Sequence, residues 1–190
     1  PAHPAAAGAL PADRGWGRLP DAGRELRSIG ARVRGRVEIH AGADDLKALL
    51  VAGRAAGVPL LHFSTHAAVD PTDANRSRML FTAEPGNQGS EYLFWREVPA
   101  LKLEGIDLVT LSACDTEGGR MVRGEGVQSF SRAFLAGGAR STLTTLWRVA
   151  DAPTADFMER FYTHLAQGET KAQALRATKL SFLNSGTELA

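Results

Sequence analysis

The sequence predicts an α/β domain in which a mostly parallel sheet lies between layers of helices, a three-layer α/β/α sandwich. Two apolar runs of strand length, at 59–67 and 106–116, end in small or polar residues, as the buried strands of parallel sheets do. Segments with apolar residues at helical spacing separate these runs from other strand candidates. Alternating strands and helices favour this class because a parallel connection needs a crossover, usually a helix.

The composition excludes several functional classes. At 190 residues the chain can hold one domain with a substantial core, whereas two full domains would be small. A net charge of +1 gives no electrostatic basis for binding nucleic acid or an anionic membrane. No apolar run approaches the roughly 18 residues that cross a bilayer, and the start of the chain lacks a secretion signal. The single cysteine fits a reducing compartment, so we expect a cytoplasmic protein.

The N-terminal part begins with a segment that has no periodic apolar face. Residues 1–18 are rich in Ala, Pro and Gly, and we expect a linker or loose arm there, with the folded domain at 19–190. Because the chain starts at Pro1 without a methionine, we expect a domain excised from a longer polypeptide. The elements expected before the first buried strand are a helix from 21, a short strand at 36–40 and a helix at 43–54.

Between the two buried strands the pattern weakens. Residues 70–103 contain two turn clusters and a short strand candidate at 79–82. Loops on a rigid sheet commonly carry substrate contacts. We therefore expect this excursion to lie beside the functional site, with residues 92–95 anchoring its return.

After the second buried strand the sequence predicts three more helices and a fourth strand. The apolar stripe of the first helix comprises Val127, Phe130, Phe134 and Leu135. The two glycines at 137–138 end this helix, and a strand over 140–147 follows. The next helix starts at Asp151, where an N-cap carboxylate followed by Pro153 fits a helix start. A last helix is expected over 170–182.

Cys114 and His66 stand at the carboxyl ends of the two buried strands. Ligands and catalytic side chains gather at this edge of a parallel sheet. A thiol acts as a nucleophile at neutral pH when a base or a positive charge is nearby, and a histidine supplies either. The separation of 48 residues (114 − 66) is close to the spacing of about 50 in one class of cysteine peptidases. We favour a catalytic dyad over the alternative, a cysteine that is only a small buried hydrophobe.

Three other kinds of site fit the sequence less well. The glycine-rich segment 118–126 lacks the G-K-S/T of a phosphate loop and the third glycine of a dinucleotide fingerprint. His62 and His66 are four residues apart, but they belong to a strand and no His-Glu-x-x-His motif is present, which disfavours zinc. No G-x-S-x-G motif supports a serine triad.

Two polar residues each keep two interpretations. His62 shares a face with His66 by strand alternation, and it either orients His66 or is a hydrogen-bonded core histidine, which we favour. Asp151 is either only a helix N-cap or a carboxylate that faces the same cleft as Cys114 and receives a basic side chain. We expect His164 to be solvated.

Five segments together resemble the CHAT domain, a family of caspase-like cysteine peptidases related to separase. In chain order they are LHFSTH at 61–66, DLVTLSACDT at 107–116, RGEGV at 123–127, RAFLAGGAR at 132–140 and LWRVAD at 146–151. The segment LPDAGREL at 19–26 is similar to the helix that precedes the core of the family. The likeness extends from about Leu19 to Phe182.

The resemblance implies a caspase-hemoglobinase-like fold and endopeptidase activity on a protein substrate. It implies that Cys114 is the nucleophile, that His66 is the general base and acid, and that the backbone N–H groups of Ala67 and Cys114 hold the oxyanion. No metal or cofactor is required. Asp151 matches the aspartate with which separase recognises a basic P1 residue, which implies cleavage after Arg or Lys. The family often follows TPR repeats in bacterial proteins, so we expect a fused or associated TPR or other regulatory domain, and neither nucleic acid nor a membrane.

The sequence departs from the family in two places. The family usually has His-Gly where this sequence has His66–Ala67, and an alanine restricts the backbone angles open to glycine. Residues 1–18 also lack the strand pattern that commonly precedes the first helix.

The expected function is therefore a regulated cysteine endopeptidase that cuts a specific protein partner. One rival is a catalytically idle CHAT scaffold or signalling module. The other is a small-molecule hydrolase or transferase, for which we would expect a closed apolar pocket.

Overall fold

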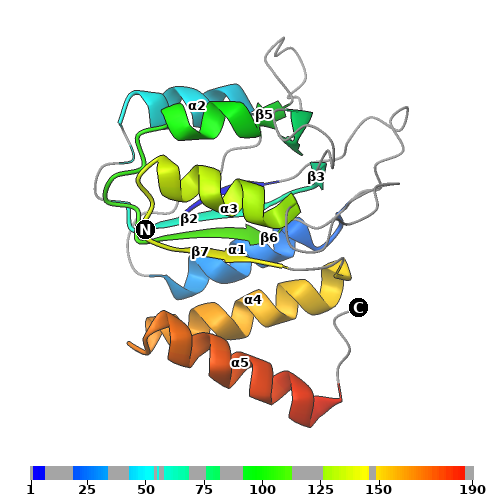
Figure 1. Cartoon of the computed structure of the whole chain (residues 1–190). Coiled ribbons are helices and arrows are strands. Elements are labelled where there is room, and N and C mark those ends of the chain that lie inside the picture. Colours follow the sequence, from blue (N-terminus) through cyan, green and yellow to red (C-terminus); the bar gives the residue numbers. More distant parts are fainter. Residues whose placement is uncertain are drawn as a thin grey trace.

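A four-stranded parallel sheet lies at the centre of the computed structural model (Figure 1). Its strands pair in the order β1 (Ala2–Ala6), β2 (Leu60–Ser64), β6 (Leu108–Ser112) and β7 (Thr142–Thr144). Each strand runs parallel to its neighbours. The structure therefore confirms the predicted α/β class with a parallel main sheet.

The structure describes residues 2–6, 19–33, 43–53, 55, 58–68, 76–81, 92–112, 126–145 and 149–186. The short strand expected at 36–40 and residues 118–125 of the glycine-rich segment lie outside these ranges.

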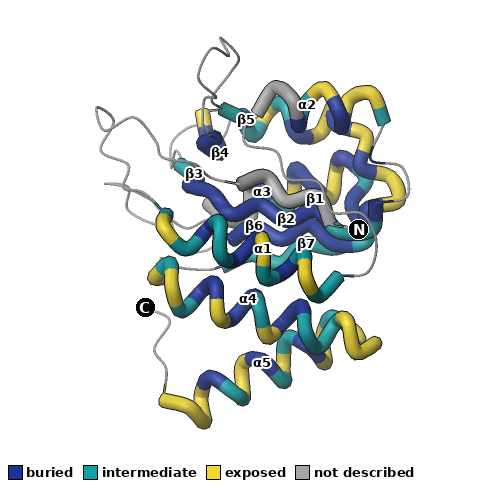
Figure 2. Tube along the Cα trace, turned by 180° about the vertical axis from the view of Figure 1, so that it is seen from behind, coloured by how far each residue is buried: buried dark blue, intermediate teal, exposed yellow. Residues whose placement is uncertain are grey.

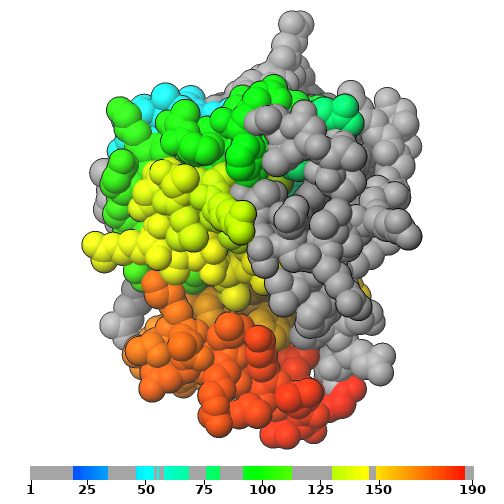
Figure 3. Space-filling view, viewed as in Figure 1, coloured from blue at the N-terminus to red at the C-terminus, as the bar shows by residue number. Residues whose placement is uncertain are grey.

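One face of the main sheet is covered by α1 (Ala22–Arg32) and α4 (Asp151–Ala166), which lie side by side (Figure 1). α5 (Lys171–Ser185) packs against α4 as an outer layer and forms one end of the molecule in the space-filling view (Figure 3). All three helices were expected, because their apolar residues recur at helical spacing. The buried residues of this core are Ile29, Leu108, Phe157, Met158, Phe161, Tyr162, Ala174 and Phe182.

The opposite face carries α2 (Ala43–Val51), the 3-10 helix η3 (Trp95–Ala100) and α3 (Gly126–Ala136). Successive residues of a strand point to opposite faces. Leu61 and Phe63 accordingly belong to the core under these helices, whereas Leu60 packs against the core on the α1 and α4 side. Seen from behind, buried residues run through the sheet, while exposed residues lie on the outer sides of α2, α4 and α5 (Figure 2).

A smaller antiparallel sheet adjoins the carboxyl end of β2. Its strands pair in the order β3 (Ala67–Ala68), β4 (Arg78–Leu80) and β5 (Tyr92–Phe94). β4 confirms the short strand expected near 79–82. Only Thr65 and His66 lie between β2 and β3, so the chain passes from one sheet to the other through the predicted catalytic histidine.

Two expectations about individual elements are wrong. The linker or arm expected over 1–18 contains the edge strand β1, which pairs with β2. Alanine and proline are poor strand formers, and an edge strand tolerates proline, so the sequence carries no strand signal there. Leu135 is 45% exposed and does not share the buried stripe of Phe130 and Phe134, because adjacent helical residues lie about 100° apart around the axis.

Candidate active site

His66 lies two residues beyond the end of β2, at the carboxyl edge of the main sheet. The residue is only 4% exposed. Its carbonyl accepts the backbone N–H of Leu80 in β4 at 2.9 Å, and the Thr65 hydroxyl donates to the Leu80 carbonyl. The excursion expected beside the site thus contacts the backbone of His66. A buried histidine whose peptide is bonded on one side has a defined position from which to act as a base.

The pairing of β2 with β6 has the same residue offset as the predicted dyad. Ser64 pairs with Ser112, an offset of 48 residues (112 − 64), and every pair of these two strands has this offset. His66 comes two residues after Ser64, and Cys114 comes two residues after Ser112. Cys114 itself lies outside the described residues. The two neighbouring strands lead the chain toward the same edge of the sheet.

Ala67, the predicted oxyanion residue beside His66, begins β3 and pairs with Met79. Within the described ranges no residue other than glycine has a positive φ. Ala67 therefore has a backbone conformation that any L-amino acid adopts, and its Cβ causes no strain. The oxyanion role of the Ala67 and Cys114 N–H groups stays a prediction.

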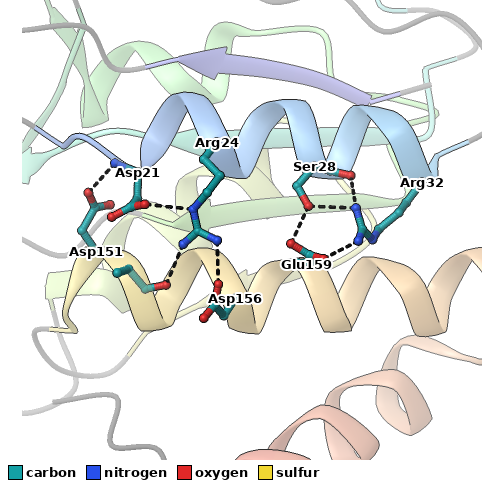
Figure 4. Close-up of polar contacts among 8 residues, drawn as sticks. Asp21, Arg24, Ser28, Arg32, Asp151, Asp156 and Glu159 are labelled. Carbon is teal, nitrogen blue, oxygen red and sulfur yellow. Dashed lines mark hydrogen bonds and ion pairs between the residues drawn. The ribbon is translucent and has the colours of Figure 1, made fainter.

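Asp151 is the first residue of α4, and the N-cap is Ala150. The N-cap prediction for Asp151 is therefore wrong by one residue. The carboxylate instead accepts the backbone N–H of Asp21, the N-cap of α1, at 2.9 Å (Figure 4). This acceptor belongs to a remote helix, and its bond joins the starts of α1 and α4.

The environment of Asp151 connects it electrostatically to His66. Burial raises the pKa of Asp151 above its ordinary value, and the hydrogen bond from the Asp21 backbone acts in the opposite direction. The negative charges of Asp21 and Glu25 raise this pKa further, whereas the charge of His66 lowers it. The role of Asp151 in the site stays a prediction.

Two arginines fix α1 against α4 (Figure 4). Arg24 donates from Nη1 to Asp156 Oδ1 at 2.7 Å and from Nε to Asp21 Oδ1 at 2.9 Å. Arg32, the last residue of α1, forms an ion pair with Glu159 and donates to the Thr163 hydroxyl at 2.8 Å. These contacts hold α4, the helix that carries Asp151, in register with α1.

His62 is a buried, hydrogen-bonded core histidine, which confirms the favoured interpretation. Its Nε2 lies 2.7 Å from Glu25 Oε1 and its Nδ1 lies 3.0 Å from Tyr162 Oη. The Tyr162 hydroxyl also lies 2.9 Å from Thr110 Oγ1 in β6. Since both ring nitrogens of His62 are occupied, this residue cannot ligate a metal together with His66.

Glu25 is a residue that the sequence analysis did not single out. It is 1% exposed and accepts from both His62 and Ser64, as a buried carboxylate requires. The signal was present in the sequence: Glu25 lies three residues after Ala22 and four before Ile29, on the buried face of α1. A charged residue on an apolar helical face indicates a buried polar partner.

His164 lies near the other end of α4. Its Nδ1 is 2.8 Å from Glu169 Oε1, and its side chain is 29% exposed. The expected solvated histidine is thus a half-exposed partner of a carboxylate. Within the described ranges, no three His, Cys, Asp or Glu residues gather as a metal site would need.

A family model described as the CHAT domain matches residues 2–188. The chain belongs to the CHAT domain family. The match begins at β1 and extends beyond α5, so it includes the strand that sequence patterns did not reveal.

One relative of this CHAT domain is Tetratricopeptide repeat protein 28 of Mus musculus, which is 40% identical over 63 residues. The match covers 33% of the present chain and 2% of the length of that protein. In the part of the chain that the structure describes, no helix is both long and apolar enough to span a membrane.

Proposed function

We propose that this CHAT domain is a cysteine endopeptidase that cleaves a protein partner, with His66 and Cys114 as its dyad. The observation that carries the proposal is the offset of 48 residues between β2 and β6, which equals the separation of the two residues. Residues that follow two adjacent parallel strands by the same number of positions are expected at the same edge of the sheet, where catalytic groups gather. Membership of a caspase-like family supports the same chemistry.

In the proposed reaction, His66 accepts the thiol proton and the Cys114 thiolate attacks the scissile carbonyl. The N–H groups of Ala67 and Cys114 donate to the oxyanion. The His66 imidazolium then protonates the leaving amine, which departs as the peptide C–N bond breaks. A water molecule, deprotonated by His66, hydrolyses the remaining thioester and regenerates the thiol.

We further propose that the fold is the three-layer arrangement of caspase-hemoglobinase proteins. Two separate cores support this proposal, one under α2 and α3 and the other under α1 and α4, with β2 and β6 contributing to both.

For Asp151 we propose a role in binding a basic P1 side chain, so that cleavage follows Arg or Lys. Its charge interaction with His66 and its partial burial support this role, since a carboxylate shielded from water attracts a guanidinium or ammonium group more strongly.

We also propose that this domain works in the cytoplasm, fused to or beside TPR repeats that regulate it. The name of the mouse relative supports the TPR association, and the single cysteine fits a reducing compartment.

The proposed function is tested by incubating the purified domain with a mixed-sequence peptide library, beside its Cys114→Ala and His66→Gln variants. We expect wild-type protein to cut and both variants to lose cutting while staying folded by circular dichroism. Cutting that persists in Cys114→Ala would disprove the dyad. If wild-type protein cuts nothing, the rate at which iodoacetamide labels Cys114 decides between a regulated enzyme and an idle module. Labelling faster than a free thiol, and slowed in His66→Gln, supports the enzyme.

A further inference from the structure

We infer that Glu25 is a positioning residue for His66, through its hydrogen bonds to His62 and Ser64 at the end of β2. This inference rests on the proposed peptidase function. It concerns a residue of α1 that does not touch the reacting atoms and acts through the strand that carries the histidine.

Both oxygens of the Glu25 carboxylate form hydrogen bonds with side chains of β2. Oε1 lies 2.7 Å from Nε2 of His62, and Oε2 accepts the hydroxyl of Ser64 at 3.1 Å. All three residues are at most 2% exposed. A buried bidentate contact of this kind is strong because water does not compete for the charged acceptor.

The same network reaches the neighbouring strand. Tyr162 Oη lies 3.0 Å from His62 Nδ1 and 2.9 Å from Thr110 Oγ1, so α4 links β2 with β6. Glu25 therefore fixes β2 against α1, while Tyr162 ties it to the strand that leads toward Cys114. Tyr162 thus hydrogen-bonds to β2 only at His62, whereas Glu25 also holds Ser64, the last residue of the strand, from the face covered by α1 and α4.

His66 is held from the opposite direction by β4. Its carbonyl accepts the Leu80 N–H, and only Thr65 separates it from Ser64. The backbone around His66 is thus held at two points, through the Glu25 carboxylate at Ser64 and through the Leu80 N–H at the His66 carbonyl. Loss of the first would leave His62 and Ser64 without an acceptor in a dry interior, and the end of β2 would relax toward new partners.

A displacement of about 1 Å in a catalytic group can cost up to about 100-fold in rate. We therefore expect Glu25→Leu to lower kcat by about 10- to 100-fold with little change in KM. Glu25→Gln should recover most of the loss, because the amide oxygen can accept from His62 and the amide N–H₂ can donate to the Ser64 hydroxyl.

The test measures kcat and KM on a peptide that wild-type protein cuts, together with the ring resonance of His66 by NMR, assigned through its loss in His66→Gln. Tyr162→Phe is the matched control, since it also removes two buried hydrogen bonds but leaves the Glu25–Ser64 contact intact. We expect the His66 resonance to shift in Glu25→Leu and to stay near its wild-type position in Glu25→Gln and Tyr162→Phe.

An unchanged His66 resonance and kcat in a folded Glu25→Leu protein would overturn the inference, as would equal changes in Tyr162→Phe. If Glu25→Leu does not fold, Ser64→Ala takes its place, because it deletes only the 3.1 Å bond. We expect the same directions of change with smaller size. The resonance does not depend on activity, so if wild-type protein cuts nothing, the labelling of Cys114 by iodoacetamide decides on the peptidase function, while the position of His66 still decides the role of Glu25.

Discussion

The carboxylate of Asp151 accepts the backbone N–H of Asp21 at 2.9 Å and so joins two helix starts that are 130 residues apart in the chain. The proposed specificity residue therefore also has a structural task. Replacing the carboxylate by an amide separates the two roles, because a neutral amide can accept the N–H of Asp21 but cannot neutralise a basic substrate side chain.

We predict that Asp151→Asn lowers the preference for Arg or Lys over norleucine at P1 by about 10- to 100-fold, the size of one charged hydrogen bond. The measurement is kcat/KM on paired peptides that differ only at P1. Asp156→Asn is the control, since it removes the same charge from the same helix at a residue bound to Arg24. An equal loss in both variants would show that the preference comes from the overall electrostatic field of the protein and not from Asp151.

The same substitution should change how stability depends on pH. The pKa of Asp151 is raised in the folded state above 3.8, mainly by burial. Wild-type protein therefore loses stability as the pH rises from the unfolded-state value through the higher folded-state value, and the loss persists at neutral pH. As the pH rises through this window, we expect the urea midpoint of Asp151→Asn to increase relative to that of wild-type protein. A constant difference between pH 3 and 7 would contradict the assignment.

Tyr162 should contribute a loss of stability at alkaline pH. Burial raises its pKa far above 10.0, so the hydroxyl stays protonated in the folded state while it ionises in the unfolded chain. Stability should fall as the pH rises above about 10. Tyr162→Phe should lack this part of the fall, although it costs about 1–3 kcal/mol at pH 7 by leaving His62 and Thr110 without a partner. The control is Tyr92→Phe, at the half-buried other tyrosine of the chain, which should still lose stability at alkaline pH.

The two arginines between α1 and α4 should differ in their contribution to stability. Arg32 is 30% exposed and bonds a carboxylate, a hydroxyl of α4 and the backbone of Ser28, so Arg32→Ala should cost about 1–2 kcal/mol. Arg24 and its partner Asp156 are 42% and 51% exposed, and Arg24→Ala should cost below about 1 kcal/mol. Urea denaturation measures both, and an equal cost would contradict this reasoning.

Gly137 should not tolerate a side chain. A Cβ there would lie 2.9 Å from Leu103 Cδ1 and 3.0 Å from the Val98 carbonyl oxygen. Because the backbone of η3 cannot move away without disturbing its packing, Gly137→Ala should lower the free energy of unfolding by about 1–3 kcal/mol. Gly23→Ala meets only the flexible end of Arg27 at 3.3 Å and should leave stability unchanged or raise it by about 0.5–1 kcal/mol, as alanine does in a helix. Thermal unfolding of the two variants gives the comparison.

The helices and the buried strands could be predicted because their periodicity reflects burial directly. Phe157 and Phe161 recur at four-residue spacing and are buried in α4. The spacing of His66 and Cys114 also carried structural information, since the offset between β2 and β6 repeats it.

The rest depended on contacts between distant segments. β1 forms a strand because it pairs with β2, and its alanines show no sequence pattern that predicts a strand. The acceptor for the Asp21 N–H comes from a residue 130 positions away, so local cap rules assigned Asp151 to its own helix. Glu25 is the exception, because its position on the buried face of α1 was visible in the sequence.

The passage of the chain through Thr65 and His66 gives the molecule a mechanical joint. The peptide of His66 is the pivot, because β2 ends before it, β3 begins after it, and the Leu80 N–H is bonded to its carbonyl. The antiparallel sheet of β3, β4 and β5 is therefore joined to the end of β2 through the backbone of His66. We expect a partner that binds and shifts this sheet to shift the backbone that carries the imidazole as well.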